Sequence, residues 1–205
     1  MIAPAAALTG PVEVLQDFVD ALPCDRPIVL VAHSNAGLHV PALVAARDIT
    51  GAIFVDAGLP TPSGRQALAP PELLEFLRGL VDQDGLLPGW THWWDDADVD
   101  ALFTSASSRR EVEAEMRRLP LGYFEQSLPI PAGWDAGPGA YLAFGDTYAA
   151  DRDAARARGW PVRALSGEHL HMLGAPNEVA DVIAELLGLL GAATDRIDPT
   201  SGRMR

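Results

Sequence analysis

The feature that most constrains this chain is a short apolar run, residues 28–32, that leads directly into the segment AHSNAG at residues 32–37. Unbroken apolar runs are typical of parallel strands that are covered on both faces. Small residues, Ala32 and Ala36, flank Ser34 at the positions where larger side chains would collide in a tight strand-to-helix turn. The pattern therefore predicts Ser34 at the apex of a strained turn at the carboxyl edge of a sheet. The alternative is an ordinary strand–helix turn that Ser34 merely caps.

The rest of the chain alternates apolar runs with helical patterns. Further apolar runs predict strands at residues 53–55, 140–144 and 162–165. Helical patterns begin at Pro11, span 37–47 and 151–158, and begin again at Pro176 with apolar residues at i, i+3, i+4, i+7, i+8 and i+11. Strands that alternate with helices indicate an α/β fold, here a mostly parallel sheet flanked by helices.

The middle of the chain differs from the rest in its sequence pattern. Prolines bound residues 60–131, and the section between them predicts short helices rather than strands, one of them opened by a capping box at 108–111. We therefore expect an α/β core at 1–59 and 132–191, a helical cap at 60–131 and a flexible tail at 192–205. The cap is rich in aromatic residues, which either line an apolar substrate pocket beneath a lid or form a small core of their own: Trp90, Trp93, Trp94, Tyr123 and Phe124.

Residues suited to activate a serine follow the predicted strands. A serine hydroxyl needs a base to remove its proton and an acid to orient that base. His169 follows the last strand and is the expected base, whereas His171 is expected to be packed or to support the site. Asp146 follows the strand at 140–144 and is the expected acid, with Asp56 as the alternative. The backbone N–H of Asn35 is expected to face the oxyanion of a reaction intermediate.

Composition narrows the classes of partner. The chain of 205 residues carries 28 acidic and 15 basic residues, a net charge of −13, which makes nucleic acid and anionic membranes unlikely partners. Its single cysteine excludes an intrachain disulfide and a cysteine-built metal site, and no phosphate-binding loop or metal-ligand cluster is apparent. We expect no cofactor and no metal. With no long apolar run and no positively charged leader, the sequence predicts a cytoplasmic protein that acts on a small molecule.

Three segments together resemble the α/β-hydrolase superfamily, and its small esterase and hydroxynitrile-lyase-like branch in particular. They are the turn at Ser34, the segment FVDAGLP at 54–60 and the segment GEHLHML at 167–173, and the resemblance spans about residues 11–191. The resemblance implies a Ser34 nucleophile, a His169 base and an Asp146 acid beneath a helical cap. It does not identify a substrate.

The chain departs from this family before the nucleophile. Only 33 residues precede Ser34, and they contain neither an earlier strand nor the His-Gly-type loop that supplies a second oxyanion N–H in the family. A start codon placed too far downstream, a partner chain that replaces the missing part, or a reduced non-catalytic descendant would each explain this. The family's strand order would leave the strand at 28–32 unpaired on one side, so we expect a marginally stable chain or a homodimer.

The residues together favour a serine hydrolase that acts on a small apolar ester or thioester through a Ser-His-Asp triad. Two alternatives stay open. One is a non-hydrolytic lyase or cyclase on the same fold, which would use His169 without an acyl-enzyme. The other is a catalytically silent, truncated hydrolase-like protein.

Overall fold

Four parallel strands form the main sheet of the computed structural model, which describes residues 10–197 and their side chains as far as Gly191. The strands lie in the order β1 (Ile28–Ser34), β2 (Ile49–Ala57), β5 (Gly139–Phe144) and β6 (Val162–Leu165). Each neighbouring pair is parallel. The mostly parallel α/β sheet that the sequence predicts is confirmed.

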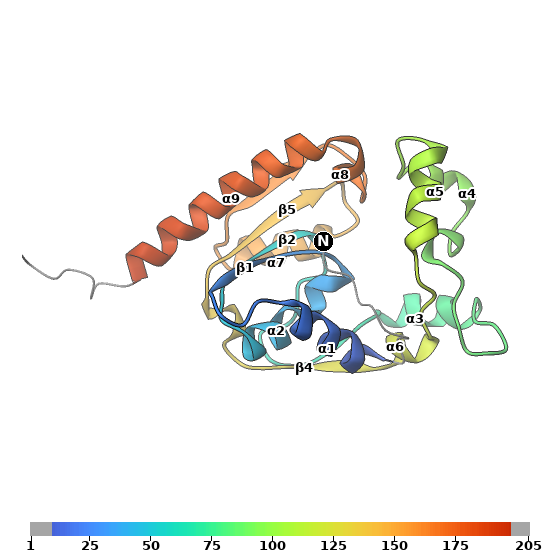
Figure 1. The fold of residues 1–205 in the computed structure, drawn as a ribbon, viewed down its shortest axis with the longest axis horizontal. Helices are drawn as coiled ribbons and strands as arrows, with labels where there is room; N and C mark the ends of the chain where they lie inside the picture. The colour runs from blue at the N-terminus through green and yellow to red at the C-terminus, as the bar shows by residue number, and fades with distance from the viewer. Residues whose placement is uncertain (1–9, 198–205) are drawn as a thin grey trace, which may run out of the picture.

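Helices cover both faces of this sheet (Figure 1). On one face α1 (Pro11–Ala21), α2 (Val40–Ala46) and α7 (Ala149–Ala157) pack against one set of strand residues. On the other face α9 (Pro176–Ile197) covers the alternate set. Phe54 and Tyr141 point to the first face, whereas Ile53 and Leu142 point to the second. Burial on both faces explains the unbroken apolar runs of the two central strands, β2 and β5, whereas β1 and β6 at the edges are only partly buried.

Several elements differ in extent from the sequence prediction. The helix expected at 37–47 is a 3₁₀ turn, η1 (Asn35–His39), followed by α2, and Pro41 lies in the first turn of α2, where a missing N–H costs nothing. Strand β2 is longer than the run at 53–55. Helix α9 continues through residues 192–197, where a flexible tail was expected, and the rest of that tail lies outside the described residues. Two short elements complete the core, η3 (Trp134–Ala136) and α8 (His171–Gly174).

The middle section contains a strand pair that the sequence analysis missed. Strands β3 (Gly64–Ala67) and β4 (Ser127–Ile130) pair antiparallel and so join the two ends of this section. Between them lie α3 (Pro71–Arg78), η2 (Trp90–His92), α4 (Asp96–Asp100), α5 (Ala106–Glu115) and α6 (Leu121–Glu125). In Figure 1 the helices α3 to α6 stand to one side of the main sheet. The division into a core and a cap stays a prediction.

The capping box of α5 is also shifted from its predicted place. Ser105, not Ser108, is the N-cap: its side chain accepts a hydrogen bond from the Ser108 backbone N–H at 3.1 Å. Ser108 Oγ in turn accepts one from the Ser105 N–H at 3.2 Å. A serine at the third helical position has served in place of the usual Glu or Gln, so the pattern at 108–111 pointed to the wrong cap.

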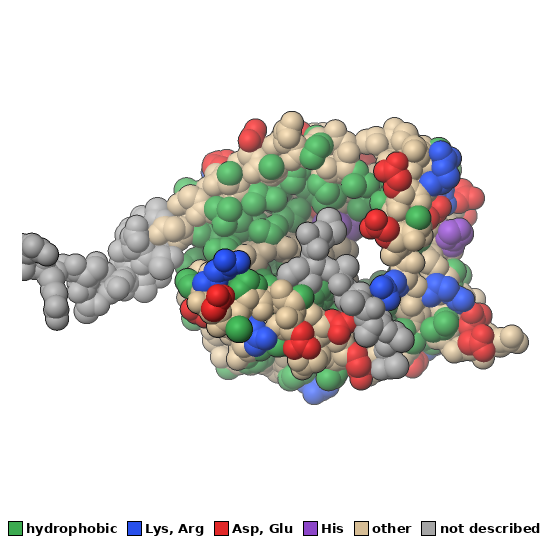
Figure 2. All heavy atoms as spheres, viewed as in Figure 1, with side chains coloured by type: hydrophobic (Ala, Val, Ile, Leu, Met, Phe, Trp, Pro, Cys, Tyr) green, Lys and Arg blue, Asp and Glu red, His purple; other side chains and the backbone are tan. Residues whose placement is uncertain are grey.

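Strand β1 is an edge strand of the sheet that the described residues form. Its Val31 side chain is half exposed, and Leu187 of α9 is exposed as well. Figure 2 shows hydrophobic side chains gathered between α9 and the strands beside it. A homodimer formed through this edge stays a prediction. None of the helices within residues 10–197 has the length and apolar character needed to cross a bilayer.

Candidate active site

The turn after β1 has the strained backbone that the sequence predicts. Ser34 adopts φ 58° and ψ −133°, a conformation that residues other than glycine rarely occupy. The Gly58 N–H donates to the Ser34 carbonyl at 3.2 Å, which ties the turn to the end of β2. A Cβ atom on Gly37 would lie 2.3 Å from the Gly58 carbonyl oxygen. The backbone approaches so closely here that only glycine fits.

Replacing Gly37 by Ala is therefore expected to lower the free energy of unfolding by about 1–3 kcal/mol, the usual cost of overpacking. Gly188, which is exposed in α9 with nothing within 4 Å of its Cβ position, provides the matched control. Gly188→Ala should stabilise the protein by roughly 0.5–1 kcal/mol, because alanine favours a helix over glycine. Urea denaturation of both variants measures the two values. A Gly37→Ala variant as stable as the original protein would contradict the close approach.

Three side chains from three segments meet at the carboxyl edge of the sheet. Ser34 Oγ lies 3.0 Å from His169 Nε2, and His169 Nδ1 lies 2.7 Å from Asp56 Oδ2. Ser34 ends β1, Asp56 lies at the end of β2, and His169 stands in the loop after β6. In this arrangement the carboxylate can orient the imidazole, and the imidazole can accept the proton of the serine.

Asp56 is held in place by a bulge in β2. His33 pairs with Val55 and Ser34 with Ala57, so Asp56 is left out of the ladder, with φ 40°. Its side chain is fully buried: Oδ1 accepts the Phe144 N–H at 3.0 Å, and Oδ2 faces the His169 ring. The bulge thus turns the carboxylate toward the imidazole instead of along the strand.

Tyr141 supports the same corner from the neighbouring strand β5. Its hydroxyl donates to the Ala57 carbonyl at 2.7 Å and accepts the Ala57 N–H at 3.1 Å. Ala57 lies beyond the residues of β2 that pair with β5, and the Tyr141 hydroxyl pairs with both of its backbone polar groups, as buried polar groups require.

The structure does not bring Asp146, the acid that the sequence analysis preferred, to His169. The turn at Gly145, with φ 56°, places the Asp146 side chain in solvent, 89% exposed, in an ion pair with Arg152 at 3.2 Å. Asp56, the alternative, occupies the place beside the imidazole. The preferred assignment is thus corrected on geometric grounds.

The second histidine of the loop lies away from the serine. His171 Nε2 is 3.1 Å from Glu178 Oε2, and its ring packs near Phe144. His171 is therefore packed, one of the two places expected for it, and a supporting role in the site stays a prediction.

His33, which the sequence analysis did not single out, contacts the loop that carries His169. Its Nε2 donates to the His169 carbonyl at 3.1 Å, and the two rings stack with centroids 4.5 Å apart. Burial lowers the pKa of His33 to about 4, with the nearby His169 as a smaller cause. His33 is therefore neutral at physiological pH. The sequence feature that could have pointed to His33 is its position directly before Ser34.

The five aromatic residues expected to line a pocket do not gather around Ser34. Tyr123 and Phe124 are buried in a second hydrophobic cluster, and Trp93 packs against it. Trp90 stacks on Phe103 of the same section, and Trp94 is half exposed. The alternative reading, a separate small core, fits these contacts better.

The same section does contact the serine turn through Asn35. The Asn35 side chain donates to the Leu68 carbonyl at 2.9 Å and accepts the Tyr123 hydroxyl at 2.7 Å. His39 Nε2 lies 2.9 Å from that same hydroxyl. These polar contacts fix the residue that follows Ser34 against the middle section.

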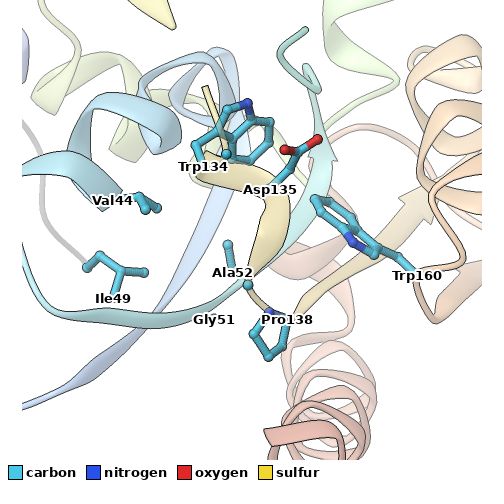
Figure 3. A pocket seen from close by; sticks show the side chains of 10 residues that line it. Val44, Ile49, Gly51, Ala52, Trp134, Asp135, Pro138 and Trp160 are labelled. Carbon is cyan, nitrogen blue, oxygen red and sulfur yellow. The ribbon is translucent and has the colours of Figure 1, made fainter. Parts of the chain in front are cut away.

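A small pocket of about 150 Å³ lies at the opposite end of the sheet (Figure 3). Trp134, Asp135 and Trp160 line it, together with residues at the amino ends of β2 and β5. Ligands of open parallel sheets bind at the carboxyl ends of the strands. This pocket is therefore not part of the site at Ser34. Within residues 10–191, no three His, Cys, Asp or Glu side chains lie close enough to hold a metal ion.

No protein-family model and no curated protein matches the sequence, but solved structures match the fold. An extracellular α/β-hydrolase from a Paenibacillus species aligns with a TM-score of 0.64 at 16% identity, over 92% of this chain and 84% of that one. Polyneuridine aldehyde esterase aligns with a TM-score of 0.61 at 14% identity, over 89% and 80%.

A third match is the methylesterase MES16 from Arabidopsis, with a TM-score of 0.52 at 18% identity, over 86% of this chain and 76% of that one. All three are proteins of the fold that the segments around Ser34, Asp56 and His169 resemble. The order of the strands, the strained serine turn and these alignments agree: the chain has the α/β-hydrolase fold.

Proposed function

We propose that the protein is a serine hydrolase that cleaves a small apolar ester or thioester, with Ser34 as nucleophile, His169 as base and Asp56 as the acid that orients the base. The observation that carries the proposal is the unbroken relay of hydrogen bonds from Asp56 Oδ2 through the His169 ring to Ser34 Oγ. Two structurally similar proteins, an esterase and a methylesterase, support the ester class.

The relay fixes the tautomer of the imidazole. A carboxylate can only accept, so the proton on His169 lies on Nδ1 and is donated to Asp56. Nε2 is then an acceptor and receives the Ser34 hydroxyl proton across 3.0 Å. The serine is thereby paired with a base that is already oriented before any substrate binds.

The reaction follows from these positions. Ser34 Oγ attacks the acyl carbon, its proton passes to His169 Nε2, and the carbonyl electron pair moves to the carbonyl oxygen. The intermediate collapses, the bond from carbon to the leaving group breaks, and the alcohol or thiol departs with the proton held by His169. Water then repeats the sequence on the acyl-enzyme and releases the acid and free Ser34. The Asn35 N–H, directly after the nucleophile, is the backbone donor expected to face the oxyanion.

Hydrolysis of a graded series of p-nitrophenyl esters and acyl thioesters, from acetyl to octanoyl, tests the proposal. We expect turnover of at least one short or medium acyl chain, with release of one equivalent of chromophore before steady state, and loss of this burst in Ser34→Ala. Failure of the original protein to cleave any member, with its fold intact, would overturn the proposal. Hydrolysis that persists in Ser34→Ala would contradict the role of Ser34 as nucleophile.

A further inference from the structure

We propose that the Tyr148 hydroxyl is a catalytic hydrogen-bond donor that stabilises the tetrahedral intermediate formed on Ser34. This inference rests on the proposed function, because it assigns a second donor to the same reaction. Tyr148 was not among the residues that the sequence analysis placed in the site.

The Tyr148 hydroxyl lies beside the reacting atom. It is 3.4 Å from Ser34 Oγ, and its ring lies 5.6 Å from the His169 ring. Tyr148 reaches this point from the turn that precedes α7, on the same edge of the sheet as Ser34, and the base of its ring packs against the hydrophobic core. Hydrogen bonds of catalytic groups are commonly long without substrate and shorten in the reacting complex.

The direction of this hydrogen bond follows from the relay. The Ser34 proton is donated to His169 Nε2, so Ser34 Oγ presents only lone pairs to Tyr148, and the tyrosine is the donor. Within residues 10–191, the Tyr148 hydroxyl has no other hydrogen-bond partner. The Tyr148 hydroxyl can therefore redirect its hydrogen bond when negative charge develops on another oxygen atom.

During attack, the charge moves from Ser34 Oγ to the former carbonyl oxygen. Both oxygens are bonded to the same carbon atom, so a donor next to one can turn to the other by a small rotation of its O–H bond. Burial raises the pKa of Tyr148 and outweighs the hydrogen bond with Ser34, which acts in the opposite direction. The hydroxyl thus keeps its proton at working pH, as a donor to an oxyanion must.

The other polar side chains around Ser34 are already committed. The Asn35 amide donates to the Leu68 carbonyl, and the Tyr123 hydroxyl donates to Asn35. His33 Nε2 donates to the His169 carbonyl. Apart from His169, Tyr148 is the side chain among the described residues with a polar atom within hydrogen-bond distance of Ser34 Oγ.

The test is Tyr148→Phe, which removes the hydroxyl and keeps the ring. We expect kcat on the best ester of the series to fall about 10²–10³-fold, as when an oxyanion donor is removed in other hydrolases, with little change in KM. Thr147→Val provides the matched control, because it removes a hydroxyl from an exposed neighbour in the same loop. It should leave kcat and KM unchanged.

A boronic acid that forms a tetrahedral adduct on serine gives a second readout. Its inhibition constant should weaken in Tyr148→Phe by about the factor by which kcat/KM falls, because a transition-state analogue loses the same interaction. An unchanged kcat, or a fall in kcat with no change in boronate affinity, would overturn the role of Tyr148 while the hydrolase proposal stood. Absence of turnover by the original protein would overturn both.

Discussion

Replacing Asp56 by Asn is expected to lower kcat about 10⁴-fold, the loss that the same change causes in a serine protease triad. The Asn oxygen can still accept the Phe144 N–H, but its NH₂ group would then face His169 Nδ1. The imidazole would have to carry its proton on Nε2, which faces Ser34, and could no longer accept the serine proton. The fold should change little, because the replacement has the same shape.

Asp146→Asn is the matched control, since it makes the same chemical change at the acid that the sequence favoured. Its carboxylate is exposed and paired only with Arg152, and such surface pairs contribute about 0–1 kcal/mol. Ester hydrolysis by both variants should therefore show kcat unchanged in Asp146→Asn. A large loss in Asp146→Asn together with a small loss in Asp56→Asn would return the role of the acid to Asp146.

Replacing Ser34 by Ala is expected to have the largest effect, a fall in kcat of about 10⁶-fold, and His169→Ala should fall by a similar factor. The two residues act as one unit, so the double variant should be no slower than either single one. His171→Ala removes an imidazole from the same loop but touches Glu178 rather than Ser34, so it should retain nearly full activity.

Single-turnover and steady-state rates on one ester measure all four variants, with thermal melting to confirm that each one folds. Losses that add in the double variant would indicate that Ser34 and His169 do not act in one step. A loss in His171→Ala as large as that in His169→Ala would contradict the relay.

The fold and the strained turn at Ser34 could be predicted from local sequence. The apolar runs of β2 and β5 reflect burial on both faces of the sheet, and the small residues around Ser34 reflect a turn with no room for larger side chains. The apolar stripe of α9 likewise predicts which face of the helix packs against the sheet. Each of these signals depends on residues that are close together in the sequence.

The choice between Asp56 and Asp146 depended on structure that local sequence does not encode. Both follow a strand, and both could in principle reach the sheet edge. The bulge in β2 and the hydrogen bonds from Phe144 and His169 place the Asp56 carboxylate beside the imidazole. The turn at Gly145 leaves the Asp146 carboxylate in solvent. The two hydrogen bonds that hold the Asp56 carboxylate, with Phe144 and His169, join residues more than 80 positions apart in the chain.

The same reason applies to the contacts that sequence analysis missed. The pairing of β3 with β4 joins short segments with weak strand patterns across about 60 residues. Tyr148 reaches Ser34 from 114 residues away, and nothing in its immediate neighbours indicates the direction of its ring. The aromatic residues of the middle section predicted either a pocket lining or a small core, and local sequence could not decide between the two.

Labelling with a fluorophosphonate tests the central claim, the activated serine, most directly. The probe forms a covalent bond only with an activated serine, so it needs no knowledge of the substrate. Peptide mass spectrometry should place one label on Ser34, with none in Ser34→Ala and a much slower reaction in Asp56→Asn than in Asp146→Asn. A label on another residue, or labelling that persists in Ser34→Ala, would contradict the account.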